Sequence, residues 1–441
     1  MSENKLKPIV NRQARLYKFQ LDTFIPDYLG NYPTSFLMTP RQMIDGSEDE
    51  LSKLTIQNLS ANFDKLTDEN ESLASYCMFL NYLADKNVNA LSMSGYVREF
   101  VRQSCRGGTV TTSNGKPIIV NEPLTMIDMN SQYPYALSCI DIPIGMPKLI
   151  TSKMSWQDVL SKKCFVVETK ITKYLKQHEL DVPLIGSKVL NNIDFNYRKF
   201  EFDQTIPPRG YYWDTVAEQP LKEFVESIYR YKKSPATRAR AKGLLNKLTG
   251  MLIRKVKKSY EKPSPFRNDV KSHPLIKEYY DDECGRVYVW RKDVDYRYSY
   301  PMIQSLVYSK AKQLMSELFT MLHQNGVRLL YTSTDSLVIP TKDLHYVKDM
   351  LDDSELGKFK IEASGERGIF IDRGLYYISD DKFSCSTCSK EAFKSYCHKN
   401  SISISDAYYN LLTQCAEVSF EYEGRHWSVG RSAIKRLCHS N

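Results

Sequence analysis

The sequence has 441 residues, enough for two or three domains that each bury a hydrophobic core. Lys and Arg outnumber Asp and Glu by 61 to 52, a surplus that suits a polyanionic partner but is also common in proteins that bind none. The ten Cys follow no secreted disulfide framework, the N-terminus starts no signal peptide and no run of about 18 apolar residues exists, so we expect a soluble intracellular protein of undetermined compartment that does not span a membrane.

Two adjacent glycines, Gly107 and Gly108, follow Arg106 in the first quarter of the chain. Because glycine has no Cβ, such a pair lets the backbone approach another strand closely. An ordinary Gly-Gly turn explains the segment equally well when it is considered alone.

An apolar run of strand character ends in Asp128, and the polar turn that follows contains Ser131, Tyr133 and Pro134. The carboxylate is therefore expected at a strand end. Considered alone, the aspartate could also simply cap the turn.

Residues 234–250 are predicted to form a helix, with Ser234 as N-cap, Pro235 as the first helical residue and Gly250 as the end. At helical spacing, one stripe of this helix carries two cations, an amide and a hydroxyl, from Arg238, Lys242, Asn246 and Thr249. The stripe could bind a triphosphate, whereas an isolated helix of this kind more often has a solvated basic face. The basic, proline-punctuated residues 255–267 come next, and they suit a solvated linker as well as an inserted element.

A second carboxylate lies 207 positions after the first, because two β-rich runs in residues 330–339 flank a tight polar turn with Asp335 at the hairpin tip. Two strand-borne carboxylates can bridge two Mg²⁺ ions while substrate phosphates complete the coordination. Together with the helical stripe, Asp128 and Asp335 favour a phosphoryl-transfer site over two unrelated turn caps.

Near the C-terminus, a C-x-x-C pair precedes a Cys-His pair, formed by Cys385, Cys388, Cys397 and His398. Four such side chains could hold zinc in a tetrahedral site. The later Cys and His spacings are irregular, so buried free cysteines are the simpler interpretation.

These segments resemble the motifs of family B DNA polymerases, in the protein-primed branch of linear plasmids, phages and viruses. Residues 128–134 match D-x-N-S-x-Y-P at every fixed place, and residues 331–336 match Y-x-D-T-D-S except at Ser333. The helix resembles K-x-x-x-N-S-x-Y-G, with matches at Lys242, Asn246 and Gly250 and departures at Lys247 and Thr249. The resemblance covers roughly residues 70 to 380.

The resemblance implies an α+β fold of palm, fingers and thumb with an antiparallel palm sheet. The implied divisions are a small N-terminal remnant of an exonuclease-type region (1–100), palm with a first insertion (101–214), fingers (215–255), a second insertion (256–300), palm (301–380) and thumb or C-terminal region (381–441).

The same resemblance implies a DNA-directed DNA polymerase that uses two Mg²⁺ ions, or Mn²⁺, held by Asp128 and Asp335. The implied nucleotide-binding residues are Ser131, Tyr133, Arg238, Lys242, Asn246 and Thr249. The implied DNA-binding residues are Arg106, Gly107, Gly108, Arg373 and Tyr376. The implied partners are primer-template DNA, deoxynucleoside triphosphates and a terminal priming protein.

Several departures from the family pattern bear on activity. Leu80 occupies the place of an exonuclease Asp and no convincing D-x-E is present, so we expect no 3′–5′ exonuclease. Other functional places are also changed, at Cys105, Thr249, Ser333 and Gly374. A pseudo-polymerase that binds DNA within a replication complex without catalysis is therefore the alternative.

Overall fold

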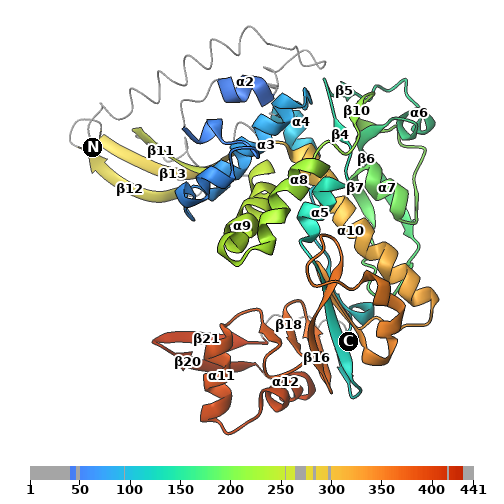
Figure 1. Ribbon diagram of the computed structural model, residues 1–441, viewed down its shortest axis with the longest axis vertical. Coiled ribbons are helices and arrows are strands. Elements are labelled where there is room, and N and C mark those ends of the chain that lie inside the picture. The colour runs from blue at the N-terminus through green and yellow to red at the C-terminus, as the bar shows by residue number, and fades with distance from the viewer. Residues whose placement is uncertain are drawn as a thin grey trace.

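The computed structural model describes residues 40–45, 50–93, 95–253, 255–263, 275–281, 285–295, 299–414 and 417–430. Helices and sheets are mixed along the described chain, and the strands named below pair antiparallel within their sheets (Figure 1). The expected α+β class is confirmed.

A five-stranded sheet forms the centre of the molecule. Its strands run in the order β1 (Val110–Thr112), β14 (Tyr331–Ser333), β15 (Ser336–Pro340), β3 (Leu124–Met129) and β16 (Phe359–Gly365). All residues of β3 are buried except Asp128, which is partly exposed. The strand is therefore fixed by its apolar residues, and the carboxylate is its one side chain with access to solvent.

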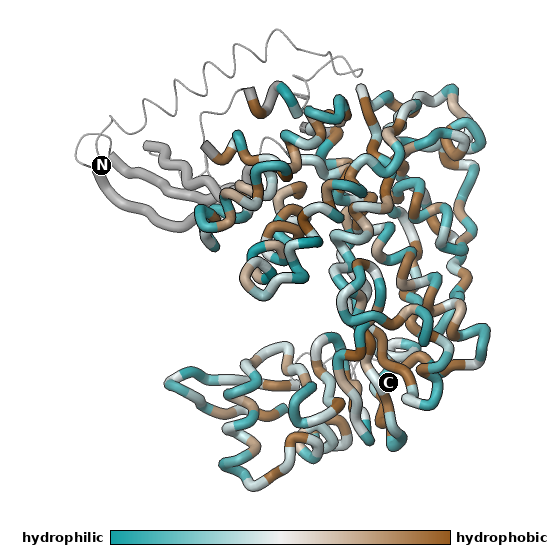
Figure 2. Tube along the Cα trace, in the orientation of Figure 1, coloured by the Kyte–Doolittle hydropathy of each residue, from teal (hydrophilic) through white to brown (hydrophobic). Residues whose placement is uncertain are grey.

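Apolar clusters cover both faces of this sheet. The long helix α10 (Pro301–Gln324) packs Met315, Leu318 and Phe319 against one face. The other face is covered by Phe370 and Tyr376 from the neighbouring sheet β19-β18-β17-β2. Figure 2 shows the hydrophobic residues concentrated along these central elements. Strands of the second sheet are β2 (Ile118–Val120), β17 (Gly368–Asp372), β18 (Leu375–Tyr377) and β19 (Phe383–Cys385).

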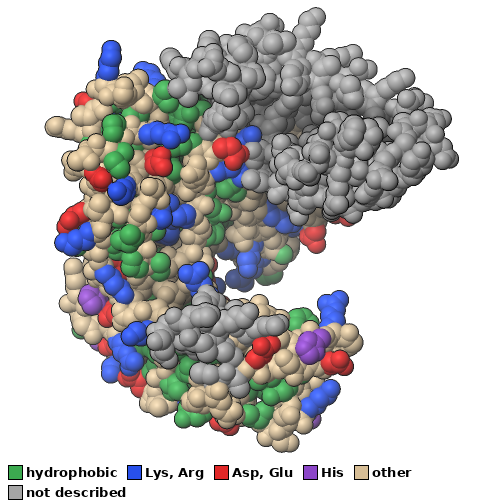
Figure 3. Space-filling model, turned by 180° about the vertical axis from the view of Figure 1, so that it is seen from behind, with side chains coloured by type: hydrophobic (Ala, Val, Ile, Leu, Met, Phe, Trp, Pro, Cys, Tyr) green, Lys and Arg blue, Asp and Glu red, His purple; other side chains and the backbone are tan. Residues whose placement is uncertain are grey.

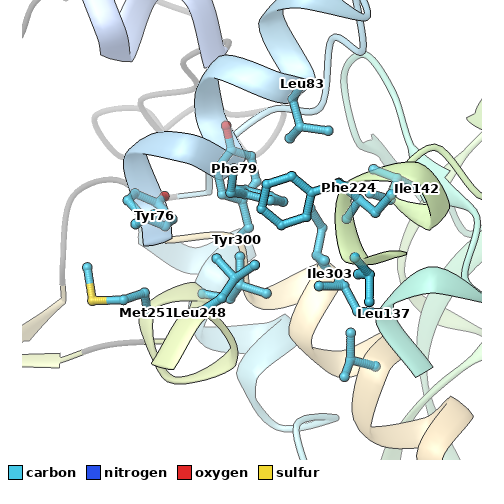
Figure 4. Close-up of a cluster of buried hydrophobic side chains, with 14 of the residues drawn as sticks. Tyr76, Phe79, Leu83, Leu137, Ile142, Phe224, Leu248, Met251, Tyr300 and Ile303 are labelled. Atoms are coloured by element: carbon cyan, nitrogen blue, oxygen red, sulfur yellow. The ribbon is translucent and has the colours of Figure 1, made fainter. Parts of the chain in front are cut away.

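A helical layer lies beside one end of the sheet. Its members are α3 (Glu71–Asp85), α5 (Gln132–Ser138), α8 (Lys222–Tyr229) and α9 (Pro235–Leu252), of which α5 and α9 contact α10. Figure 4 shows their shared core, in which Tyr76 and Phe79 of α3, Phe224 of α8, Leu248 of α9 and Tyr300 lie together. Short elements beside this layer are α2 (Pro40–Asp45), η2 (Glu50–Lys53), η3 (Ser60–Lys65), α4 (Gly95–Arg102) and η5 (Arg230–Lys233).

The remaining elements form smaller units around this centre. One sheet joins β5 (Lys148–Leu149), β9 (Arg209–Trp213), β6 (Cys164–Tyr174), β7 (Gly186–Asn191) and β8 (Phe200–Phe202). Near it lie η4 (Ser113–Gly115), α6 (Trp156–Leu160), α7 (Asn192–Tyr197) and the strand pair β4 (Ile142–Pro143) and β10 (Val216–Ala217). Towards the C-terminus come η7 (Thr341–Met350), α11 (Lys390–Lys399), α12 (Ile404–Thr413), β20 (Val418–Tyr422) and β21 (Arg425–Val429).

One expectation of local structure was wrong, and the structure decides between two alternatives left open for another segment. Helix α9 continues through Gly250 to Leu252, because Met251 and Leu252 are buried and their burial outweighs the cost of a glycine in a helix, about 1 kcal/mol. Residues 255–263 are a strand and not a solvated linker: β11 (Lys255–Pro263), β13 (Gly285–Asp295) and β12 (Leu275–Asp281) form a three-stranded sheet. Residues 264–267 lie outside the described chain.

Two further features follow from the described residues. Leu80 is buried in the core of the helical layer, where it is 5% exposed. Across the described helices, none has the length and apolar character that crossing a membrane requires.

Candidate active site

Both carboxylates predicted from the sequence lie at one end of the central sheet. Asp128 on β3 is paired in register with Ser336 on β15, the residue that follows Asp335. Ser333 pairs with Ser336, so Thr334 and Asp335 form the two-residue turn of the β14–β15 hairpin. Sheet register therefore brings together two carboxylates that are distant in sequence.

The tip of this hairpin is held from three sides. The amide of Met129 donates to the carbonyl oxygen of Asp335 at 2.8 Å, and the amide of Thr334 donates to the carbonyl oxygen of Thr109 at 2.8 Å. The Gln132 side chain donates to the Thr334 carbonyl oxygen at 3.1 Å. Thr334 has a φ of 60°, an uncommon conformation for a β-branched residue, which these contacts stabilise.

The two carboxylates differ in their electrostatic surroundings. Asp335 forms no ion pair with any described residue, and burial together with the charge of Asp128 raises its pKa to about 6. Asp128 forms an ion pair with Lys360 of β16, with 2.9 Å between Oδ1 and Nζ. Burial still raises the pKa of Asp128, although Lys360 acts in the opposite direction.

Opposite the carboxylates, the predicted stripe of α9 lines the same cavity. Arg238, Lys242, Asn246 and Thr249 all border it. Within the described part of the chain, no acidic side chain forms an ion pair with Arg238 or Lys242. Figure 3 shows, from behind, Lys and Arg side chains near the hollow of the molecule. These two cations are therefore available to an anionic ligand.

Lys232 of η5 adds a third cation to this side. Burial and the charges of Lys242 and Arg238 lower its pKa to about 8. Its Nζ donates to Ser131 Oγ at 2.7 Å and lies 4.5 Å from the centre of the Tyr229 ring. The crowding of like charges indicates a place where a bound anion would relieve repulsion.

The turn after Asp128 orients two predicted nucleotide-binding residues. Ser131 has a left-handed backbone, with φ 54° and ψ 56°, and precedes α5. Tyr133, in the first turn of α5, packs against the Tyr308 ring at 5.4 Å between centroids. Its hydroxyl oxygen accepts a hydrogen bond from the Gly108 amide at 3.3 Å. Tyr133 is thereby fixed at the cavity wall.

The cavity has a volume of about 510 Å³, within the range of small-molecule sites. It brings together both catalytic and all six nucleotide-binding candidates. Its other lining residues are Met129, Asn130, Gln132, Pro134, Tyr229, Lys232, Lys233, Asp353, Ser354 and Lys360.

The cavity offers Mg²⁺ two carboxylate ligands, and a bound triphosphate would have to supply others. Among the described residues, no three His, Cys, Asp or Glu side chains form a group that could hold a metal ion. Asp128 and Asp335 supply hard oxygen ligands, and Mg²⁺ is often held by one or two carboxylates with waters and substrate phosphates. The two aspartates would therefore hold the ions together with a triphosphate. The same finding gives no support to zinc at Cys385, whose Sγ lies 2.9 Å from the Tyr408 hydroxyl.

None of the five DNA-binding candidates is among the residues that line the cavity. The Arg106 guanidinium is 3.1 Å from Asp194, whose side chain is fully buried. A Cβ at Gly108 would collide with Thr334, so the close approach observed there is to the hairpin tip. Tyr376 is buried against the Tyr331 ring. Arg373 is exposed, and a Cβ at Gly107 would meet no neighbour.

Sequence reasoning missed two charged residues that shape this site. Lys360 reaches Asp128 because β16 pairs with β3, and no local motif reveals that pairing. Glu71 of α3 has a side chain only 4% exposed and pairs with Arg240 at 2.8 Å and Lys247 at 2.7 Å, on α9. An acidic residue at the start of the otherwise uncharged stretch 71–80 was the one sequence signal for this contact.

Comparisons with known proteins give one family match and several similar folds. Residues 49–252 match the family described as DNA polymerase type B, organellar and viral. Phi29 DNA polymerase in complex with primer-template DNA and incoming nucleotides has a similar fold, with a TM-score of 0.55, 15% identity, and coverage of 85% of this chain and 68% of that one. The expected resemblance to family B DNA polymerases is thus confirmed over residues 49–252, and the likeness to Phi29 DNA polymerase shows a shared fold. A search of curated proteins gives no match.

The similarity does not extend over the whole of the larger protein. In the post-translocation binary complex of Phi29 DNA polymerase with primer-template DNA, the match has 16% identity and a TM-score of 0.53. It covers 79% of this chain, which spans 64% of the Phi29 chain.

Proposed function

We propose that this chain, a relative of the organellar and viral type B DNA polymerases, adds deoxynucleotides to a primer 3′ hydroxyl under the direction of a DNA template. One observation carries the proposal: a single cavity joins Asp128 and Asp335 at a sheet end to the cationic stripe of α9. Carboxylates for metal ions and cations for a triphosphate are the two requirements of nucleotidyl transfer.

Each wall of the cavity has a proposed role. Asp128 and Asp335 would hold two Mg²⁺ ions, which when bound activate the attacking hydroxyl and neutralise charge on the leaving pyrophosphate. Arg238 and Lys242 would bind the β and γ phosphates, since a guanidinium fork and an ammonium both suit phosphate oxygens. Asn246 and Thr249, further along the stripe, would border the nascent base pair.

The sugar of the nucleotide would lie against Tyr133. Its ring is held by Tyr308 and by the Gly108 amide, so it can present a fixed surface that excludes a 2′ hydroxyl. Ser131 would lie beside the phosphates through its contact with Lys232.

The proposal also covers priming and proofreading. The family resemblance favours initiation from a terminal priming protein as well as extension of DNA primers. Leu80 at the place of an exonuclease Asp favours an enzyme without 3′–5′ exonuclease activity. A 3′-labelled single strand should then stay intact with protein and Mg²⁺, and metal-dependent shortening that survives Asp335→Ala would refute this.

Primer extension with the purified chain tests the main proposal. Labelled primer-template and deoxynucleotides are incubated with Mg²⁺ or Mn²⁺, and the Asp335→Ala variant is the control. Extension by the wild type alone supports the proposal. Absence of extension in both metals, from folded protein that binds primer-template DNA, rejects it.

The second candidate function is a pseudo-polymerase that binds DNA without catalysis. The observation that favours it is the Lys360 ammonium at Asp128, together with Ser333 at the place of a motif aspartate. The same extension and DNA-binding experiment separates the two functions.

A further inference from the structure

Lys360 is held opposite a proposed metal ligand by the central sheet. The register of β16 against β3 pairs Lys360 with Asp128, and their side chains make an ion pair of 2.9 Å. The Lys360 side chain is 38% exposed and that of Asp128 16% exposed, so the pair is partly enclosed. The Lys360 backbone is fixed by the sheet while its ammonium is carried on a flexible stem.

The charges that line the cavity favour the ion pair between Lys360 and Asp128 as long as no metal has entered. Five basic side chains line the cavity, from Lys232, Lys233, Arg238, Lys242 and Lys360, against three acidic ones, from Asp128, Asp335 and Asp353. A divalent cation entering alone therefore meets more positive than negative charge. A triphosphate that enters with the metal reverses this balance, because it adds several negative charges at once.

We propose that Lys360 is a resident cation that occupies Asp128 in the metal-free protein and must leave it for a divalent metal to bind. The proposal rests on the proposed function only for the identity of the metal site. It follows that the chain binds divalent metal weakly by itself and much more tightly when a nucleoside triphosphate is present.

Neighbouring pairs support a specific role for Lys360. Glu362, two residues further along β16, pairs with Lys382 at 2.9 Å and is therefore already neutralised. Asp335 has no ion-pair partner in the described part of the chain. Asp128 is thus the one of the two proposed metal ligands whose charge the protein itself compensates, and Lys360 is the side chain that does so.

Mn²⁺ binding to the full chain, followed by electron paramagnetic resonance, tests the inference without any measurement of activity. The variants are Lys360→Gln, Lys360→Arg, the double variant Lys360→Gln with Asp128→Asn, and Lys173→Gln as a matched control. Lys173 makes an exposed ion pair of 3.0 Å with Glu201 on the sheet β6–β8, so its replacement removes a similar pair elsewhere.

Without nucleotide, Lys360→Gln should bind Mn²⁺ about 10-fold more tightly than the wild type, because one repelling cation is gone. Lys360→Arg and Lys173→Gln should bind as the wild type does, and the double variant should lose the gain. With a non-hydrolysable deoxynucleoside triphosphate, the difference between Lys360→Gln and the wild type should fall to about 3-fold or less, because the triphosphate screens Lys360.

Equal Mn²⁺ affinity of the wild type and Lys360→Gln without nucleotide, or a gain that persists in the double variant, overturns the inference. These outcomes are independent of primer extension. If Lys360→Gln gains metal affinity but no variant extends a primer, the inference stands and the proposed function fails. If the wild type extends primers while its Mn²⁺ affinity is unchanged by Lys360→Gln, the proposed function stands and the inference fails.

Discussion

The two walls of the cavity are held in place by different forces. The wall that carries Asp128 and Asp335 is fixed by the backbone hydrogen bonds of one sheet and of the hairpin tip. The wall that carries Arg238 and Lys242 is a helix, α9, whose opposite side is bound to α3 through Glu71. The first wall therefore depends on strand register, whereas the second depends on a buried charge from the N-terminal part of the chain.

The comparison also separates two groups of cations on one helix. Arg240 and Lys247 both pair with Glu71 and serve the contact between α9 and α3. Arg238 and Lys242 face the cavity and make no ion pair with a described residue. A basic helix can thus use one face for its own attachment and keep the other for a ligand, which a count of its charges would not reveal.

The largest effect is expected at the sheet wall. Asp128→Ala and Asp335→Ala should each lower the rate of primer extension by about 1,000-fold or more, or about 4 kcal/mol, because either change removes an oxygen ligand that the metal ions require. Single-nucleotide incorporation measures the rate. Asp349→Ala, at an exposed position of η7, is the control and should extend primers as the wild type does.

The next largest effect is expected from breaking the contact between α9 and α3, and it concerns the free energy of unfolding. Glu71→Ala should lower the free energy of unfolding by about 3 kcal/mol, because it leaves Arg240 and Lys247 without their shared buried partner. Urea denaturation measures this, and the apparent KM for nucleotide should rise as α9 loses its support.

Asp68→Ala is the matched control for Glu71, since Asp68 pairs with the same Arg240 at 2.7 Å but its side chain is 92% exposed. It should change stability little, because solvent screens an exposed pair. Equal effects of the two variants would contradict a structural role for the buried charge.

Replacement of Asp335, the carboxylate without an ion pair among the described residues, should stabilise the protein by an amount that depends on pH. The folded pKa of Asp335 is about 6, above its unfolded value, so its ionisation costs folding energy as pH rises from about 4 to 6 and the full cost remains above pH 6. Without metal, Asp335→Asn should therefore be about 3 kcal/mol more stable than the wild type at pH 8.

This gain should shrink as pH falls through 6 and disappear below pH 4, where folded and unfolded wild type are both protonated. Urea denaturation in EDTA across this pH range provides the measurement. A gain that is constant with pH would mean that the amide improves packing, and that the charge is not responsible.

The residues that line both walls were predictable from the sequence. Asp128 and Asp335 each end or interrupt a short apolar run, so local patterns were sufficient to place them at a strand end and a hairpin turn. The stripe of α9 was equally accessible, because helical periodicity places Arg238 and Lys242 on one face. In each case the sequence signal comes from residues that are neighbours along one element.

What the sequence did not reveal depends on contacts between distant elements. Lys360 reaches Asp128 only through the pairing of β16 with β3, and Glu71 reaches α9 across the helical layer. Gly250 was wrongly taken as a helix end, since the burial that keeps α9 intact through Leu252 comes from tertiary packing. Local propensity cannot report such contacts.

A smaller effect is expected where the two walls meet the sugar of the nucleotide. Tyr133→Val should raise the use of ribonucleotides relative to deoxyribonucleotides by about 10-fold, or about 1.4 kcal/mol, because the ring that excludes the 2′ hydroxyl is removed. Competing incorporation of the two nucleotides measures the ratio. Tyr133→Phe keeps the ring and loses only the contact with the Gly108 amide, so it should retain most of the discrimination. An unchanged ratio in an active Tyr133→Val variant would assign the sugar contact to another residue.

The smallest effect concerns Thr249, at the end of the helical wall. Its hydroxyl donates to the Asn246 carbonyl oxygen at 2.8 Å, and its side chain borders the cavity while only 7% of the residue is exposed. Thr249→Tyr should lower the apparent KM for nucleotide by about 3-fold, since it supplies aromatic contact area beside the nascent base pair. Thr249→Phe should give the same gain if area is the cause, and steady-state incorporation at varied nucleotide concentration measures both. A rise in KM for both variants would show that the enclosed position cannot take a ring, and that this wall is set by packing against the helical layer more than by the ligand.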